Sequence, residues 1–294
     1  MIRVKVSLAD SVWQTLCWFD VFGHAVSLEE IHRFLFWQKA SRKEVEGVLK
    51  KDRRVGASFG FYFLRGKNVN VIARCGRQFQ SGKLWKRVAR HLFIFRITPF
   101  LRLVAVGNTL AMGWPKKNSD IDLLVVAPRN RLFTTRFFLT FWSQIFGIRR
   151  HGRKIAGRFC LSFFLAGNSL DLEKLKIADN DIYLAFWAAT LIPIHGDSTE
   201  FFAANNWIRK YFPNLKLKTT TRKFRRKNFC EKVLSGRFGN LVEQILRKWQ
   251  LARASRKKQN STKNAVVISD EILKFHESDQ REKFLREWQK RVNS

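Results

Sequence analysis

The chain has 294 residues, enough for more than one modest domain, and 46% of them are hydrophobic, which excludes intrinsic disorder over most of its length. Its 56 Lys and Arg against 23 Asp and Glu give a net charge of +33, which favours a phosphate-rich partner such as a nucleic acid; a lysine-rich proteome is the alternative explanation. The four cysteines lack metal-ligand spacing, the amino end lacks a signal peptide's apolar core, and no apolar run is long enough to span a bilayer. We therefore expect a cytoplasmic protein with no membrane contact.

Residues 1–80 show three short helical patterns followed by two short strands around Gly60, the order of elements in a winged helix-turn-helix. Ser27 and Ser41 each precede a glutamate by three residues, the capping-box pattern that begins a helix. The third helix, expected over about Arg42–Lys51, is basic at both ends and could enter a DNA groove. Docking of a protein or positioning of a substrate is the alternative role for such a module.

Residues 81–180 alternate helices and strands, which predicts a mixed α/β sheet. The expected elements in chain order are a helix over 81–95, strands over 101–106 and 121–127, a helix over 131–146 and a strand over 158–165. The fold class expected for the whole chain is therefore α+β, with a small central sheet and flanking helices.

Residues 181–294 are predicted to form a basic helical region, with helical patterns at 181–192, 199–212, 241–251 and 270–291. Between 209 and 258, 17 Lys or Arg stand against two glutamates, with aromatic residues interleaved. This stretch could follow a phosphate backbone, although its aromatic side chains could also pack inward. The stretch 252–265 lacks apolar periodicity and is expected to be a flexible basic linker.

Two aspartates lie where the strand over 121–127 begins. Because side chains alternate along a strand, Asp120 and Asp122 should emerge on one face, with Cα atoms about 6.5–7 Å apart. Such a pair can hold divalent cations that align an attacking oxygen with a leaving phosphate oxygen, and Mg²⁺ prefers oxygen ligands. Upstream, the turn "NTLAMG" over 108–113 could present backbone N–H groups and the Thr109 hydroxyl to phosphates. An ordinary βαβ edge with solvated acids is the alternative.

The stretch "NTLAMGWPKKNSDIDL" resembles the signature of the polymerase-beta-like nucleotidyltransferases, in which Gly-Ser and Ala-Arg-Gly precede an Asp-apolar-Asp-apolar core. Six residues align with the functional positions of that signature: Asn108, Thr109, Gly113, Ser119, Asp120 and Asp122. The resemblance implies transfer of a nucleoside monophosphate from an NTP to an acceptor. It further implies that the two aspartates are catalytic and hold Mg²⁺ or Mn²⁺, and that the other four residues bind the nucleotide.

Members of that superfamily usually carry a third acid on a later strand, and the strand expected over 158–165 has none. Asp171 follows a turn and is either that acid or a solvated loop residue. Met112 stands where arginine is common, and Lys116 and Lys117 are close enough in sequence to replace the charge. Arg131, on the helix after the aspartates, could neutralise phosphate, as could Arg136; surface or packing roles are the alternative.

Two functions remain open from the sequence. The first is a metal-dependent nucleotidyltransferase acting on an unidentified acceptor, with RNA or DNA as candidates. The second is a winged-helix regulator that binds nucleic acid and carries a catalytically inactive nucleotidyltransferase-like domain.

Overall fold

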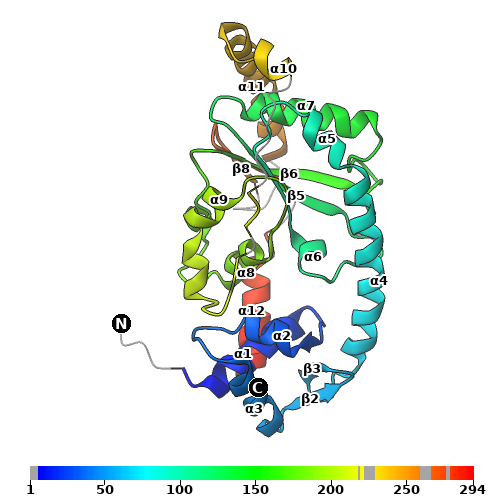
Figure 1. Cartoon of the computed structure of the whole chain (residues 1–294), viewed down its shortest axis with the longest axis vertical. Helices are drawn as coiled ribbons and strands as arrows, with labels where there is room; N and C mark the ends of the chain where they lie inside the picture. The colour runs from blue at the N-terminus through cyan, green and yellow to red at the C-terminus, as the bar shows by residue number, and fades with distance from the viewer. Residues whose placement is uncertain (1–5, 218, 222–228, 259–265, 276–278) are drawn as a thin grey trace.

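A computed structural model describes residues 6–217, 219–221, 229–258, 266–275 and 279–294. It combines helices with one small and one larger sheet, which confirms the α+β class. Figure 1 shows an elongated molecule, with the larger sheet in its upper half and the N-terminal helices in its lower half. No helix in the described ranges combines the length and the apolar character needed to cross a membrane.

The N-terminal part has the predicted order of three helices and a hairpin. The elements are α1 (Leu8–Val21), β1 (Val26–Ser27), α2 (Leu28–Arg33), α3 (Arg42–Lys51), β2 (Val55–Ser58) and β3 (Phe61–Leu64). The strands form a sheet of order β1-β3-β2. Both predicted capping boxes are confirmed, because Ser27 and Ser41 each exchange hydrogen bonds with a glutamate three residues later.

A long helix, α4 (Val69–Arg90), connects the hairpin to the larger sheet (Figure 1). It begins 12 residues earlier than the helix predicted over 81–95 and includes the boundary expected at residue 80. The first half of α4 buries polar side chains and exposes apolar ones: Arg74 Nη1 donates to Glu30 Oε2 at 2.8 Å, while Ile72 and Phe79 are exposed. A helix with this reversed pattern does not show the apolar periodicity by which helices are recognised in sequence. The predicted helix also divides at His91, after which α5 (Leu92–Ile97) begins.

The larger sheet has the strand order β7-β4-β5-β6-β9-β8. Its strands are β4 (Leu103–Val106), β5 (Ile121–Ala127), β6 (Phe159–Ala166), β7 (Ile192–Gly196), β8 (Val266–Ile268) and β9 (Ile272–Phe275). The pair β5–β6 is parallel and is connected by α7 (Leu132–Ile145), whereas the other pairs are antiparallel. The predicted strands and helix at these positions are confirmed, with ends that move by at most two residues.

The region expected to be helical also supplies strands to the larger sheet, namely β7, β8 and β9. Its helices are α8 (Ile182–Thr190), α9 (Thr199–Ala204), α10 (Phe229–Val233), α11 (Arg237–Lys258) and α12 (Arg281–Val292), and short turns η1 (Glu173–Leu175) and η2 (Asn206–Lys210) lie between them. The helix predicted over 270–291 is wrong in its first part, because Ile272–Phe275 pairs with β6. The linker expected over 252–265 is helical as far as Lys258, and 259–265 lies outside the described residues.

Two apolar cores cover the two faces of the larger sheet. One contains Val104, Val125 and Phe164 together with residues of α4, α5 and α7. The other face packs against α8, α12 and the N-terminal helices in a single continuous cluster. Within this cluster, Trp13 Nε1 donates to Val292 O at 3.2 Å and Trp288 Nε1 to Gln14 O at 2.9 Å. The first and last described helices therefore lie together against the same side of the sheet.

Candidate functional site

The alternation of β5 separates its apolar residues from the two aspartates. Ile121, Leu123 and Val125 belong to the core beneath α7, while Asp122 shares the opposite face with Leu124. One ligand atom from each of Asp120, Asp122 and Cys160 lies within 4.8 Å of the others. The prediction that the two carboxylates lie on the same side of the strand is confirmed.

These carboxylates line a cleft of about 540 Å³ between the sheet, α8 and α12. The cleft is lined by residues from distant parts of the chain: Phe22, Arg77, Asn108, Thr109, Met112, Trp114, Lys116, Ser119, Phe163, Tyr183, Trp187, Lys274, Asp279, Arg281 and Phe284 are among them. Its volume is in the range of sites that enclose a small organic ligand. The lining includes aromatic rings, cations and the aspartate pair.

The small-residue turn forms one side of the cleft and begins the short helix α6 (Asn108–Ala111). Asn108 adopts a φ of 51°, the left-handed conformation that asparagine tolerates better than most residues, and its side chain hydrogen-bonds to Asp122. Thr109 Oγ1 donates to Ser119 Oγ at 3.3 Å. Two hydroxyl groups therefore lie beside the carboxylates.

Gly113 is the one predicted nucleotide-binding residue that does not line the cleft. Its φ of +84° turns the chain after α6, and a Cβ at this position would meet open space. Of the two lysines expected to replace the missing arginine, Lys116 lines the cleft and Lys117 does not. The glycine therefore shapes the turn, and Lys116 supplies a cation to the cleft wall.

The surroundings of Asp122 favour its protonated form. Burial, and after it the charge of Asp120, raises the pKa of Asp122 to about 7. Asp120 is compensated by Arg150, whose Nη1 donates to Asp120 Oδ2 at 2.8 Å. A divalent cation would relieve the repulsion between the two acids, so these oxygen donors fit Mg²⁺ or Mn²⁺.

Cys160 occupies the position beside the pair where a third acid was sought. It lies on β6 in register with Asp122 of the parallel strand β5. Burial, followed by the charge of Asp122, raises the pKa of the thiol to about 12, so Cys160 remains protonated and is a poor ligand for Mg²⁺. Asp171 instead accepts a hydrogen bond from Glu173 N at 2.8 Å in the loop after β6. Within the described residues, the acids that gather here are Asp120 and Asp122.

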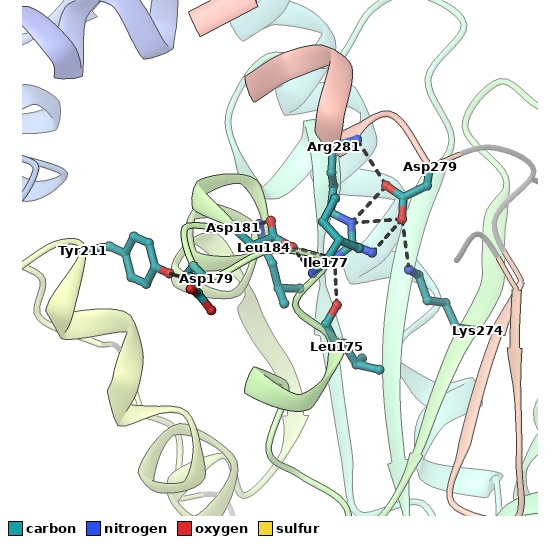
Figure 2. Close-up of polar contacts among 9 residues, drawn as sticks. All are labelled: Leu175, Ile177, Asp179, Asp181, Leu184, Tyr211, Lys274, Asp279 and Arg281. Atoms are coloured by element: carbon teal, nitrogen blue, oxygen red, sulfur yellow. Dashed lines mark hydrogen bonds and ion pairs between the residues drawn. The ribbon is translucent and has the colours of Figure 1, made fainter. Parts of the chain in front are cut away.

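An ionic network forms another part of the cleft wall, and Figure 2 shows its members. Arg281 Nη1 donates to Asp181 Oδ2 at 2.7 Å, and Arg281 Nη2 donates to Asp279 Oδ2 at 2.6 Å. Lys274 Nζ lies 3.9 Å from Asp279 Oδ2, and burial, followed by the charge of Arg281, lowers the pKa of Lys274 to about 8. Figure 2 shows that Arg281 reaches from the start of α12 to Leu175, the last residue of η1. This network fixes α12 over the cleft.

Two stacked aromatic pairs complete the lining. Phe22 and Trp114 have ring centroids 5.1 Å apart and planes inclined by 15°, and Tyr183 and Phe284 are 5.3 Å apart and inclined by 9°. These rings come from the end of α1, the turn after α6, α8 and α12. Flat apolar surfaces beside a polar centre suit a ligand that combines a planar ring with charged groups.

Comparison of the chain with protein-family models, with curated proteins and with solved structures finds no match. The features that point to a function are therefore the sequence pattern over residues 108–123 and the geometry of the cleft.

Several residues of the site have no recognisable signal in the sequence. Arg150 lies in the segment after α7, 30 residues from its partner Asp120, and Lys274, Asp279 and Arg281 are more distant still. Arg131, considered as a phosphate ligand, instead packs inside the protein, where its Nη2 donates to Asn240 Oδ1 at 2.8 Å. Only the folded chain brings these groups to their partners.

Proposed function

We propose that the chain is a metal-dependent nucleotidyltransferase that moves a nucleoside monophosphate from an NTP to a hydroxyl of an acceptor. The observation that carries this proposal is the convergence of Asp120 and Asp122 in a cleft that Asn108, Thr109 and Ser119 also line. A solvated pair of strand-edge acids would not require the enclosing aromatic and cationic walls.

Asp120 and Asp122 would hold Mg²⁺ or Mn²⁺. When bound, the metal neutralises phosphate oxygens and promotes loss of the acceptor hydroxyl's proton. Arg150 contacts an oxygen of Asp120, so this guanidinium must share or yield that oxygen when a cation binds. The raised pKa of Asp122 makes cation affinity rise with pH through about 7, because the metal and the proton compete for the same carboxylate.

The remaining groups of the cleft would orient the nucleotide. The hydroxyls of Thr109 and Ser119 and the cation of Lys116 are placed for the triphosphate, and the stacked rings are placed for the base. In the reaction, the acceptor oxygen forms a bond to the α-phosphorus and the bond from that phosphorus to the bridging oxygen breaks. Pyrophosphate leaves, and the hydroxyl proton passes to solvent.

The test is incorporation of α-³²P-labelled NTPs, offered one at a time with Mg²⁺ or Mn²⁺, into pooled RNA, DNA and small hydroxyl-bearing acceptors. Asp120→Asn and Asp122→Asn keep the shape of each side chain and should lower incorporation by roughly 10³-fold, because charge at the reacting centre is lost. Asp171→Asn is the matched control, since this acid lies outside the cleft, and should keep wild-type incorporation. Incorporation that survives Asp122→Asn would contradict the proposal.

A second candidate is a nucleic-acid-binding regulator whose nucleotidyltransferase-like part is inactive. Two observations favour it: Cys160 stands where a third acid was sought, and α3 presents Arg42 and Lys43 on its exposed side. This function predicts nucleotide binding without incorporation, together with DNA affinity that is lost in an Arg42→Ser/Lys43→Ser variant.

A further inference from the structure

A second cavity, of about 900 Å³, lies beyond the aspartates, between α7, α11, β6 and the segment over 148–155; we call it the arginine groove. Helices α7 and α11 lie together at the upper end of the molecule (Figure 1), where Glu243 of α11 accepts a hydrogen bond from Phe133 N at 3.0 Å. Its lining includes Arg136, Phe137, Phe141, Arg149, Arg150, His151, Cys160, Trp249, Arg253 and Phe275.

The described residues of the arginine groove give it positive charge, of which Asp120 compensates Arg150. Four of its lining residues are arginines, and among the described residues that line it none is Asp or Glu. Arg136 lies deep in the groove, where its Nη1 donates to the neutral Gln250 Oε1 at 2.6 Å. Burial, and after it the charges of Arg149 and Arg253, lowers the pKa of Arg136 to about 10. Arginines that lie this close together repel one another and are stabilised when an anionic ligand binds.

Aromatic side chains are exposed beside these cations. Phe141 is 43% exposed and Trp249 is 52% exposed, and both line the groove, one from α7 and the other from α11. Phe141 also stacks on Phe137, with ring centroids 6.2 Å apart and planes inclined by 13°. Arginines that follow a phosphate backbone, combined with open aromatic faces, are the features that bind unpaired nucleotides, because each base has a face to stack. Bases in a duplex are already stacked on each other and cannot use these rings.

The arginine groove and the cleft meet at the carboxylate pair. Arg150 lines the groove and donates to Asp120 Oδ2 at 2.8 Å, while Cys160 lines the groove and lies within 4.8 Å of both acids. Asn108 and Thr109, which are proposed to hold the triphosphate, line the cleft and not the groove. A strand lying in the groove would therefore bring its end to the carboxylates from the side that the nucleotide leaves open.

We propose that the arginine groove binds a single-stranded nucleic acid, and that this strand presents the acceptor hydroxyl at Asp120 and Asp122. The acceptor role rests on the proposed transferase function, whereas binding of the strand does not. Phosphates lie along Arg149 and Arg253, and bases stack on Phe141 and Trp249.

The test measures binding of fluorescein-labelled RNA and DNA single strands of about 12 nucleotides by fluorescence anisotropy, with the full chain and without NTP or metal. The groove variants are Arg149→Ser/Arg253→Ser and Trp249→Ser. Their matched controls are Lys283→Ser/Arg286→Ser, which removes the same charge from exposed positions of α12, and Phe229→Ser, which removes an exposed ring from α10. Thermal melting verifies that each variant is folded.

Each groove variant should weaken single-strand binding about tenfold at physiological salt, and the double arginine variant should also reduce the salt dependence, because fewer counterions are released. The controls should stay within about twofold of wild type. Equal affinity for RNA and DNA would assign recognition to phosphates and bases, and tighter binding of RNA would add a contact to the 2′-hydroxyl; both results support the groove.

Three results would overturn the proposal: no binding of single strands by the wild type, unchanged binding by the groove variants, or preference for a duplex regardless of Trp249. The Asp120→Asn/Asp122→Asn variant distinguishes binding of the strand from transfer of the nucleotide. If this variant binds the strand and the wild type incorporates no nucleotide, the groove stands and the transferase fails. If the wild type modifies a small acceptor and binds no strand, the transferase stands and the groove fails.

Discussion

Arg281→Met tests whether the ionic network at the start of α12 holds the cleft wall in place. The guanidinium is 7% exposed, and its partner Asp181 is 2% exposed at an Nη1–Oδ2 distance of 2.7 Å. Methionine keeps an unbranched side chain of similar length but cannot donate a hydrogen bond. Asp181 then keeps only backbone donors, from Ile177 N at 3.2 Å and Leu184 N at 2.9 Å.

Removal of one partner from a buried ion pair costs about 3–5 kcal/mol of unfolding free energy, because the other charge stays buried without compensation. Asp181 caps α8 and retains two N–H donors, so we expect the lower end, about 3 kcal/mol. In Asp181→Asn/Arg281→Met the charge of Asp181 is gone while the cap oxygen remains, and Asp279, which also loses Arg281, keeps Lys274 as a partner. This double variant should recover at least about 1 kcal/mol relative to Arg281→Met.

The assay is urea unfolding at pH 7, followed by tryptophan fluorescence and by circular dichroism. Arg247→Met is the matched control, because Arg247 pairs with Asp270 on the surface, where the two side chains are 42% and 59% exposed. Loss of such an exposed pair should cost less than about 1 kcal/mol. If Arg281→Met costs no more than this control, or if Asp181→Asn adds to its cost, the ion pair does not hold the cleft wall.

Three further outcomes follow from buried groups. Asp122→Asn should stabilise the metal-free protein at pH 8 by at least about 1 kcal/mol in urea unfolding, while it abolishes incorporation. The reason is that the pKa of Asp122 is raised in the folded state, so the aspartate costs stability as the pH rises from 3.8 through about 7. A destabilised variant would contradict this. Glu243→Ala should cost about 2 kcal/mol by thermal melting, since this carboxylate accepts the first N–H groups of α7, whereas exposed Gln244→Ala should cost little. Burial, and after it the charge of Arg74, lowers the pKa of His24 to about 3, so the unfolded chain binds a proton at higher pH than the folded chain and stability should fall as the pH drops from 6.5 toward 3. His24→Gln should reduce this loss of stability by up to about 1.4 kcal/mol per pH unit. An unchanged dependence of stability on pH would refute the assignment to His24.

Elements with regular patterns could be predicted from the sequence. The strand over 121–127 matches β5, and both capping boxes begin the helices they were expected to begin. The first half of α4 was missed because its inward face is polar, with Arg74 held by Glu30. β9 was read as part of a helix because its short sequence ILKF, three apolar residues and a lysine, fits either structure, and only its pairing with β6 decides between them.

The aspartate pair of the candidate site and the turn before it could be predicted from the sequence, whereas the ionic network of the cleft wall could not. Asp120, Asp122 and the turn before them lie within 15 residues, so strand alternation and the signature place them together. The network depends on Arg281 and Asp279, which reach the cleft only because α12 packs across α8 and α1. The contact of Arg150 with Asp120 likewise depends on the path of the chain after α7. Two adjacent arginines in a loop form no sequence motif that would predict this contact.

The position of Arg150 has a thermodynamic consequence for the two cavities. Its Nη1 group donates to Asp120, and the same side chain lines the arginine groove. A cation bound at Asp120 would release this guanidinium toward the groove, and a phosphate in the groove that attracts the guanidinium would expose Asp120 to the cation. We therefore expect positive cooperativity between the two ligands, in which each raises the equilibrium affinity of the other by the same factor.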